Sequence, residues 1–379
     1  MTFQEIKALT WDHPRGFNAL DAASKSAEVT ASGLKIHWDK QPLEGFESHP
    51  IADLCSRYDL VVLDHPHVGE ALVHDCLVPL EEVFSQDVIS NMAAGSIGPS
   101  LSSYHMAGRH WALPLDAATQ VMAIRSDLLD YSVPLTWDEV RRVSEATGKV
   151  ALSLAGPHAF VSYLAIATAL GEPPSELDPA VLVSQKVGEA AFEIMADLQS
   201  RSPIAVRPFN PIGILGHMAA NDDVLLCPLI YGYVNYADPS ASKPITFQNA
   251  PRAAIGGRPG STLGGTGIGI SRRCDITPAL KQHLLWLMAD DAQTRFIPFH
   301  DGQPSLRSAW HDASVNERWS NFYSNTAETL ESAYVRPRHN GYIPFQSEGS
   351  AILRHAFDEG TSAGKAVADI QAAYLASRI

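Results

Sequence analysis

The chain has 379 residues, of which 45% are hydrophobic and 18% charged, and its formal net charge is −14 at pH 7. This length exceeds what one hydrophobic core usually supports, so the composition predicts a globular protein of two domains and excludes a disordered chain. The negative charge argues against nucleic acid or an anionic membrane surface as a partner, because both require clustered Lys and Arg side chains.

The first quarter of the chain predicts strands that alternate with helices. Short apolar runs at residues 6–10 and 60–63 and a strand-like segment at 34–38 predict strands, and helical spacing marks residues 18–32 and 51–55. The run at 60–63 is continuously apolar, which is typical of a parallel strand covered on both faces. This βαβα order predicts a three-layer α/β unit that places ligands at the carboxyl ends of its strands.

The second quarter contains a predicted crossover and a helix start. Pro114 ends an extended segment at residues 110–114, and a separate strand is predicted at 120–125. Because Pro cannot donate to a strand ladder, this break favours a crossover between domains. Thr136 and Glu139 have the spacing of a capping box, so a helix is predicted to begin there.

The second half contains further elements and a Gly-rich strand. Strands are predicted at 152–154 and 223–228, and helices at 160–170, 187–198, 278–296 and, for most of its length, 310–378. Between Ala250 and Gly269 the density of Gly and Pro rises, which indicates turns and close backbone approach. The segment Leu-Gly-Gly-Thr-Gly-Ile-Gly-Ile at 263–270 predicts a strand in this region.

The order of several short motifs resembles the family 1 extracellular solute-binding proteins, the maltose-binding-protein-like receptors of ABC importers. The motifs are Leu-Pro-Leu-Asp at 113–116, Pro-Leu-Thr-Trp-Asp-Glu at 134–139, Met-Ala-Ala-Asn-Asp-Asp at 218–223, the Gly-rich strand at 263–270, Asp-Gly-Gln-Pro-Ser at 301–305 and Arg-Pro-Arg-His-Asn-Gly at 336–341. The resemblance covers essentially the whole chain. It implies a two-lobed, type II periplasmic-binding-protein-like α/β fold, with residues 1–112 and 265–305 in lobe 1 and residues 113–264 and 306–379 in lobe 2.

The resemblance also implies a function and a partner. A receptor of this kind is expected to hold a small polar solute, such as a sugar, a polyol or a related metabolite, in a cleft between its lobes and to close about a hinge. An ABC permease is then the expected partner, and the protein is expected to be a monomer. No cofactor is expected.

Candidate ligand residues follow the first strand and the strand at 60–63. The junction between the first predicted strand and the following helix contains Trp11, Asp12, His13 and Arg15. At such a junction, side chains and backbone N–H groups can face a ligand. The local alternative is that Asp12 caps the next helix and Trp11 is core.

Asp64 and His65 follow the strand at 60–63, with His67 close behind. Together with Asp12 and His13 they offer carboxylates and imidazoles, which suit a divalent metal or an acid–base pair. The spacing includes no helical His-x-x-x-His face, so hydrogen bonding to a ligand is the favoured interpretation and a metal site is not predicted.

The remaining candidates lie near the predicted crossovers. Asp116 is expected to be buried, so either a ligand or a neighbouring Arg must satisfy it, and ligand contact is favoured. Either Tyr231 or Tyr233 is expected to offer an aromatic face, but not both, because period-2 residues on one face can equally be core. The resemblance places Gly265 and Thr266 in the lining of the cleft, and their neighbourhood lacks the spacing of a nucleotide-binding loop.

The four cysteines, Cys55, Cys76, Cys227 and Cys274, lie far apart and form no Cys-x-x-Cys pair. They are predicted to be buried thiols rather than parts of a zinc site or a disulfide framework. No apolar run approaches the ~20 residues of a membrane span.

Location and activity stay open at the level of sequence. The first residues resemble a strand and not an export leader, so a chain that naturally starts at Met1 is expected to be cytoplasmic. A leader that had been removed would instead place the protein in the periplasm or at the cell surface. The alternative function is a cytoplasmic enzyme on the same scaffold, with Asp12, His13, Asp64 and His65 performing acid–base chemistry on a small acid or sugar derivative.

Overall fold

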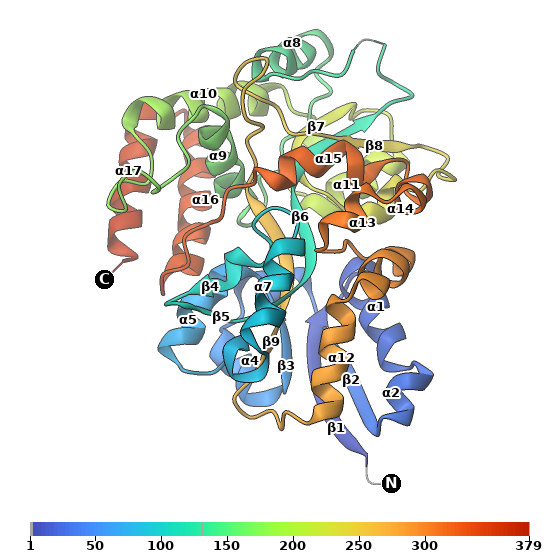
Figure 1. Cartoon of the computed structure of the whole chain (residues 1–379). Helices are drawn as coiled ribbons and strands as arrows, with labels where there is room; N and C mark the ends of the chain where they lie inside the picture. Colours follow the sequence, from blue (N-terminus) through green and yellow to red (C-terminus); the bar gives the residue numbers. More distant parts are fainter. Residues whose placement is uncertain (1–2, 131, 379) are drawn as a thin grey trace. The chain divides into compact units, whose positions relative to one another are not determined.

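The computed structural model describes residues 3–130 and 132–378 (Figure 1). The chain divides into two units that exchange segments: unit 1 contains residues 1–118, 264–317 and 338–340, and unit 2 contains residues 119–263, 318–337 and 341–379. The sequence-based division instead changes lobe at 112/113, 264/265 and 305/306. The ends of the predicted lobes at residues 1–2 and 379 lie outside the described residues.

Unit 1 is built on a mixed sheet. The strands β2 (Leu34–Gln41) and β3 (Leu60–Leu63) run parallel to β1 (Gln4–Trp11) on its two sides, and β9 (Leu263–Ile270) runs antiparallel to β3. All four residues of β3 are buried, as their continuous apolar character predicts. The predicted βαβα order is therefore confirmed, and the carboxyl ends of β1 and β3 meet at one edge of the sheet.

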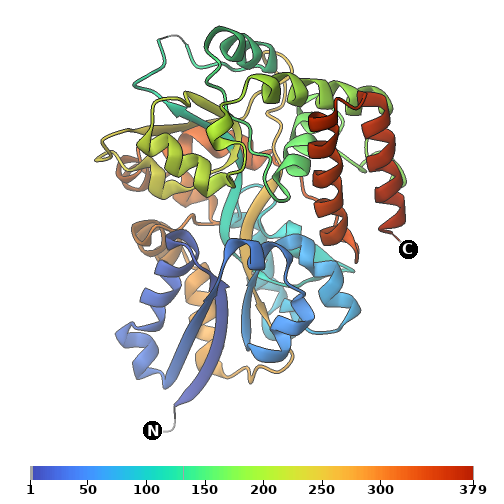
Figure 2. The same ribbon diagram turned by 180° about the vertical axis from the view of Figure 1, so that it is seen from behind.

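Helices flank this sheet. Helices α1 and α2 pack on β2, α3 on β1 and α4 on β3. Figure 2 shows the same sheet from behind. The helices that lie wholly in unit 1 are α1 (Pro14–Ser24), α2 (Ala27–Ala31), α3 (Leu43–Ser48), α4 (Ile51–Arg57), α5 (Val68–Val73), α6 (Leu80–Val83), α7 (Gln86–Gly95), α12 (Pro278–Met288) and α13 (Arg307–His311), and α14 (Ala313–Arg318) ends one residue beyond the unit. Two short strands, β4 (His105–Met106) and β5 (Arg109–His110), form a separate hairpin.

Two helices of unit 1 are shorter than predicted. The segment 18–32 divides into α1 and α2, because the Ser26 side chain accepts the N–H of Val29 at 3.2 Å and starts a new helix. The predicted helix 278–296 ends at Met288, where Ala289 turns to extended backbone, and it is followed by a π-helical turn at Ala292–Phe296. Both differences arise at local breaks that the hydrophobic spacing alone does not reveal.

Unit 2 is mainly helical around one buried helix. Every residue of α9 (His158–Ala169) is buried, and it packs against α10 (Gln185–Arg201) and α16 (Tyr342–Glu359). Figures 1 and 2 agree that α17 (Ala363–Ala376) lies alongside α16. The other helices are α8 (Trp137–Thr147), α11 (Pro211–Ala220) and α15 (Phe322–Glu331).

The predicted capping box at the start of α8 is confirmed. The Thr136 side chain accepts the N–H of Glu139 at 3.3 Å, and the Glu139 carboxylate accepts the N–H of Thr136 at 3.0 Å. The same carboxylate accepts the N–H of Leu135 at 2.8 Å, and these backbone hydrogen bonds lower its pKa. The helix start is thus fixed by contacts within five residues, which is why the sequence reveals it.

The strands of unit 2 correct two predictions. The strands β7 (Leu226–Tyr231) and β8 (Ile245–Gln248) both pair antiparallel with β6 (Leu113–Arg125). The prediction of a strand at 152–154 is wrong, because the neighbouring backbone makes a single bridge, Val150 to Leu226, and no ladder continues from it. The predicted start of β7 at residue 223 is also too early.

Two long strands carry the chain from one unit to the other. Strand β6 changes unit at 118/119 and β9 at 263/264. The sequence predicts a break at Pro114, but β6 is continuous. Pro114 is only its second residue, where a missing N–H costs the ladder little, and its carbonyl accepts a hydrogen bond from the Ser305 hydroxyl.

Candidate functional site

The end of β1 places three buried side chains together. The Trp11 indole stacks on the His13 ring, with ring centroids 5.1 Å apart and planes 7° from parallel. His13 caps α1 by accepting the N–H of Arg15 at 3.2 Å, and all three side chains belong to residues that are less than a tenth exposed. Asp12 is exposed instead and pairs with Lys40 at 2.6 Å. The side chain that caps the helix is therefore that of His13, and the alternative in which Asp12 caps it is wrong.

Arg15 and Asp116 form a buried ion pair. The Arg15 Nε donates to Asp116 Oδ1 at 2.9 Å and Nη2 donates to Oδ2 at 2.5 Å, so the contact is bidentate. Only 4% and 5% of the two side chains are exposed. The sequence predicts that a buried Asp116 is satisfied either by a ligand or by a neighbouring Arg, and in the structure Arg15 is such a partner. The guanidinium also lies 5.4 Å from the Trp11 ring, so Trp11, His13, Arg15 and Asp116 form one group, the strand-end cluster.

Asp64 and His65 form a second group after β3. The Asp64 carboxylate accepts the N–H of His65 at 2.8 Å and lies 3.0 Å from Nδ1 of the same ring. His65 is fully buried and stands edge-on to Tyr104, whose hydroxyl donates to the Leu63 carbonyl at 3.1 Å. Asp64 thus caps the short 3₁₀ turn His65–His67. Within residues 3–130 and 132–378 no group of three or more metal-ligand side chains is found.

Strand β9 brings Gly265 and Thr266 against the same region of unit 1. Gly265 has a φ of +85°, and a Cβ built on it would lie 2.3 Å from the Asp116 carbonyl oxygen. The backbone therefore approaches β6 more closely than any side chain would allow. Thr266 is 3% exposed, and its buried hydroxyl has no hydrogen-bond partner among the residues that the structure describes. A buried hydroxyl of this kind is suited to a polar ligand, because an unmade hydrogen bond is costly.

Replacing Gly265 with Ala tests this close approach. We expect the variant to lower the free energy of unfolding by about 2–4 kcal/mol, the combined cost of an unfavourable φ and a backbone clash. Gly33 is the matched control, because it has a φ of +82° and nothing within 4 Å of the added Cβ. Gly33→Ala is expected to cost only about 1 kcal/mol in urea unfolding. Equal losses in the two variants would contradict the close contact with Asp116.

The two Tyr candidates of unit 2 differ in exposure: Tyr231 is half-buried, whereas Tyr233 is buried. Tyr231 ends β7 and is half-buried; its hydroxyl donates to the Leu263 carbonyl at 3.4 Å and its ring stands edge-on to His158 at 5.9 Å. Tyr233 is 4% exposed and lies beyond the strand, so the two rings do not alternate along one ladder. Of the two Tyr candidates, Tyr231 is therefore the one with accessible surface.

Sequence reasoning missed Gln120. This residue is 1% exposed, its side-chain N–H group donates to Ser162 at 3.1 Å, and its side-chain carbonyl oxygen is buried without a partner. It pairs in the ladder with Tyr231, so the two lie side by side at the end of β7. The signal was a polar residue at the edge of an apolar run, which is weak because such residues are often exposed.

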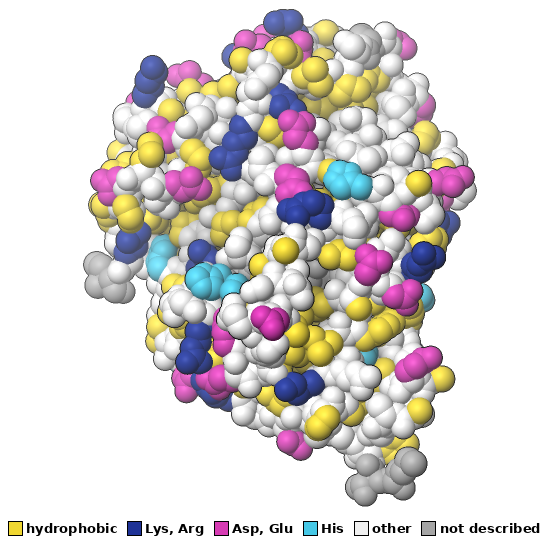
Figure 3. Space-filling model, viewed as in Figure 1, with side chains coloured by type: hydrophobic (Ala, Val, Ile, Leu, Met, Phe, Trp, Pro, Cys, Tyr) yellow, Lys and Arg dark blue, Asp and Glu magenta, His cyan; other side chains and the backbone are white. Residues whose placement is uncertain are grey.

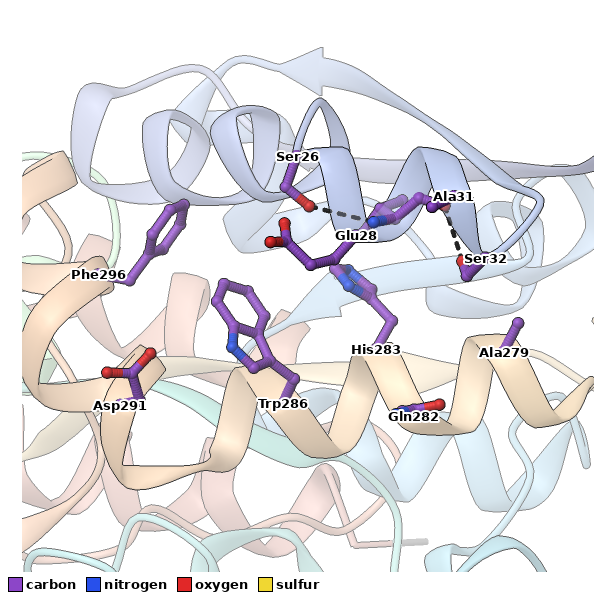
Figure 4. Close-up of a pocket in the computed structure, with 11 residues that line it drawn as sticks. Ser26, Glu28, Ala31, Ser32, Ala279, Gln282, His283, Trp286, Asp291 and Phe296 are labelled. Carbon is purple, nitrogen blue, oxygen red and sulfur yellow. Dashed lines mark hydrogen bonds between the residues drawn. The ribbon is translucent and has the colours of Figure 1, made fainter.

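A separate pocket of about 640 Å³ lies between α2 and α12 in unit 1 (Figure 4). His283 and Trp286 project from α12 toward Glu28 on α2, and the Trp286 ring stands edge-on to Phe296 at 5.1 Å. Burial lowers the pKa of His283 to about 4. None of the strand-end residues lines this pocket, so it is distinct from the predicted ligand groups.

Charges on the face seen in Figure 3 are interspersed. Basic and acidic side chains alternate over this face, and no large basic area is visible on it. No helix within the described part of the chain combines the length and apolar character needed to span a membrane.

Comparison with known proteins identifies the relatives of this chain. Residues 52–316 match the model of a family described as bacterial extracellular solute-binding protein. No curated protein sequence matches the chain significantly.

Similar solved structures share the fold at low sequence identity. Maltose-bound MalE3 from T. maritima has a TM-score of 0.79 at 17% identity, with 98% of each chain covered. A solute-binding protein of an ABC transporter from Agrobacterium radiobacter, in complex with ribitol, has a TM-score of 0.79 at 18% identity, with 99% of each chain covered. One from Thermotoga lettingae, bound with α-D-tagatose, has a TM-score of 0.81 at 14% identity, with 100% of each chain covered. The expected two-lobed, solute-binding-protein-like α/β fold is confirmed.

Proposed function

Because the chain belongs to the bacterial extracellular solute-binding protein family, we propose that it captures a small polar solute between its two units by hinge closure. The observation that carries the proposal is the family match over residues 52–316. The similar structures were determined with maltose, ribitol and α-D-tagatose, so a sugar or polyol is the proposed class of solute. An ABC permease is the proposed partner, and a periplasmic or surface location is proposed for the secreted protein.

Each unit would supply a different part of the binding surface. Unit 1 would offer the strand-end cluster, the Asp64–His65 pair, and the backbone and hydroxyl of Gly265 and Thr266. Unit 2 would offer the Tyr231 ring and the side-chain oxygen of Gln120. Sugars and polyols combine apolar C–H faces with hydroxyl groups, and this set combines aromatic faces with hydrogen-bonding groups.

The mechanism needs no covalent chemistry. A solute that contacts both units binds the closed arrangement more tightly than the open one, and this differential affinity shifts the equilibrium toward closure. The chain crosses between units in β6 and β9, and these strands are the proposed hinge. The matches give no support to the acid–base enzyme alternative.

A thermal-shift screen tests the proposal. We expect at least one sugar or polyol to raise the unfolding temperature, because a ligand at 100 times its Kd adds about 2.7 kcal/mol to the stability of the bound state. The screen should include amino acids and betaines as other solute classes, followed by calorimetric titration of each hit. Consumption of a hit during incubation would favour the enzyme alternative, and the absence of any hit among sugars and polyols would contradict the proposed class.

Tyr231 provides the site-specific test. We expect Tyr231→Ala to weaken binding of the hit roughly tenfold, since an aromatic contact contributes about 0.5–1.5 kcal/mol. Tyr236 is the matched control, because it follows β7 by five positions and its hydroxyl donates to the Ile212 carbonyl at 3.3 Å. Tyr236→Ala should leave the Kd unchanged in the same titration. Equal weakening in both variants would remove Tyr231 from the proposed site.

A further inference from the structure

Two of the four cysteines lie next to each other in unit 1. Cys55 is in the last turn of α4 and is buried, whereas Cys76 follows α5 and is partly exposed. Cys76 packs against the hydrophobic cluster that includes Leu54 and Cys55. Cys55 belongs to this cluster, and each thiol is the largest cause of the shifted pKa of the other, although 20 residues separate the two in the chain. The sequence gives no sign of this proximity.

Hydrogen bonds to two different segments fix the backbone at Cys76. The N–H of Cys76 donates to the Ala71 carbonyl at 3.2 Å, and its carbonyl accepts the N–H of Arg272 at 3.0 Å. Asp75 has a φ of +45° and its carboxylate pairs with Arg272 at 2.9 Å. The turn that presents Cys76 to Cys55 is therefore fixed by contacts with the end of β9, not by the thiols themselves.

We propose that Cys55 and Cys76 form a disulfide when the protein meets a disulfide oxidant, such as glutathione disulfide or the disulfide of a thiol oxidoreductase. A disulfide requires that the two side chains be neighbours, so that no large backbone movement is needed, and Cys76 packs on the cluster that contains Cys55. An extracellular family is exposed to the oxidising conditions in which such bonds persist. This inference goes beyond solute binding and does not depend on it.

The two thiols have unequal roles in the reaction. The contact with Cys55 is the largest cause of a lowered pKa at Cys76, while the same contact, followed by burial, raises the pKa of Cys55. Cys76 is also the more accessible, so its thiolate is the one that attacks an external disulfide first.

The exchange balances in two steps. The Cys76 thiolate attacks one sulfur of the oxidant R–S–S–R, which forms a mixed disulfide and releases one RS⁻. The deprotonated Cys55 then attacks the Cys76 sulfur, which forms the Cys55–Cys76 bond and releases the second RS⁻. The two thiols lose two protons and two electrons, and the electrons reduce the oxidant to two thiolates.

The bond would close a loop that contains part of the candidate site. Residues 55–76 include β3, the 3₁₀ turn His65–His67 and α5, and hence Asp64. Cross-linking restricts this segment in the unfolded chain, which stabilises the folded unit. The disulfide would thus stabilise the folded segment that contains the second group of candidate ligand residues.

Intact mass and thiol labelling test the proposal. The full chain is treated with glutathione disulfide and quenched with acid, and its intact mass is compared with that of the reduced protein before both samples are denatured and alkylated. We expect a mass loss of about 2 Da, two unlabelled thiols that map to Cys55 and Cys76, and an unfolding temperature higher by about 5–10 °C. Four labelled thiols, a stable glutathione adduct at Cys76 or a cross-link to Cys227 or Cys274 would overturn the proposal.

A serine variant at the partly exposed position provides the control. Cys76→Ser should fold, should show no oxidant-dependent rise in unfolding temperature and should leave Cys55 open to labelling after denaturation. The matched Cys274→Ser variant should keep the full rise, since Cys274 is also in unit 1 but is not part of the pair. An oxidant-dependent rise in the Cys76→Ser protein would also overturn the proposal. Solute affinity measured on the reduced protein separates this result from the proposed function.

Discussion

Asp116→Asn is expected to lower the free energy of unfolding by about 3–5 kcal/mol, because it removes the carboxylate that binds the buried Arg15 guanidinium through two hydrogen bonds. The side chains of this pair are 4% and 5% exposed and joined by two hydrogen bonds, so water cannot replace the lost carboxylate. Urea unfolding followed by circular dichroism measures the change, with tryptophan fluorescence reporting the strand-end cluster through Trp11. Because the chain has two units, the transitions are to be fitted separately.

The exposed pair Asp12–Lys40 is the matched control for this experiment. Asp12 is also an Asp at the edge of the unit 1 sheet and contacts Lys40 at 2.6 Å, but 58% and 41% of these side chains are exposed. Asp12→Asn should therefore cost no more than about 1 kcal/mol.

The double variant Arg15→Met/Asp116→Leu extends the test, since apolar replacement of both partners removes both charges of the buried pair and should recover most of the loss. Similar costs for Asp12→Asn and Asp116→Asn would contradict a buried pair.

Features that depend on neighbouring residues could be predicted from the sequence. The strands β1 and β3 follow directly from apolar runs, β2 from the strand-like segment at 34–38 and β9 from the Gly-rich segment at 263–270. The start of α8 follows from Thr136 and Glu139. The break after Met288 could not be predicted, because hydrophobic spacing does not reveal a local change to extended backbone, and the strand predicted at 152–154 is missing because no ladder continues from the bridge of Val150. Hydrophobic spacing predicts which face of an element is buried, but it does not predict at which residue a helix or a strand ends.

The candidate site shows the same division between local and distant contacts. The rule that ligand groups gather at strand ends made the segments after β1 and β3 candidates, but it did not predict which of their side chains are buried. Asp12 is exposed while its neighbours are buried, and Asp116 is paired with an Arg 101 positions away in the chain. Contacts at that separation leave no trace in one sequence. The proximity of Cys55 and Cys76 and the buried oxygen of Gln120 were missed for the same reason.

Acidification is expected to destabilise the protein between pH 6.5 and about pH 4 because two buried His residues are neutral in the folded state. Burial lowers the pKa of His283 to about 4, and burial followed by the positive charge of Arg15 lowers that of His13 to about 3. In the unfolded chain an imidazole takes up its proton near pH 6.5. The stabilising effect is therefore complete above pH 6.5 and is lost as the pH falls toward the folded pKa, by about 1 kcal/mol per pH unit for each His.

Replacing His283 with Phe isolates one of the two contributions. The ring keeps an aromatic surface beside Trp286, whose centroid lies 6.1 Å from that of His283, but it can no longer take up a proton. In urea unfolding at pH 7.5, 6, 5 and 4.5, the variant should lose less stability than the unmodified chain. The difference in the free energy of unfolding should be about 1 kcal/mol for each pH unit below pH 6.5.

His37 on β2 is the control position for this experiment, because it is exposed and water solvates its imidazole in both states. His37→Gln should retain the full pH dependence of the unmodified chain. If His283→Phe instead retains that full dependence, the imidazole in the α2–α12 pocket is protonated in the folded protein, and an acidic rim that includes Glu28 must compensate its burial.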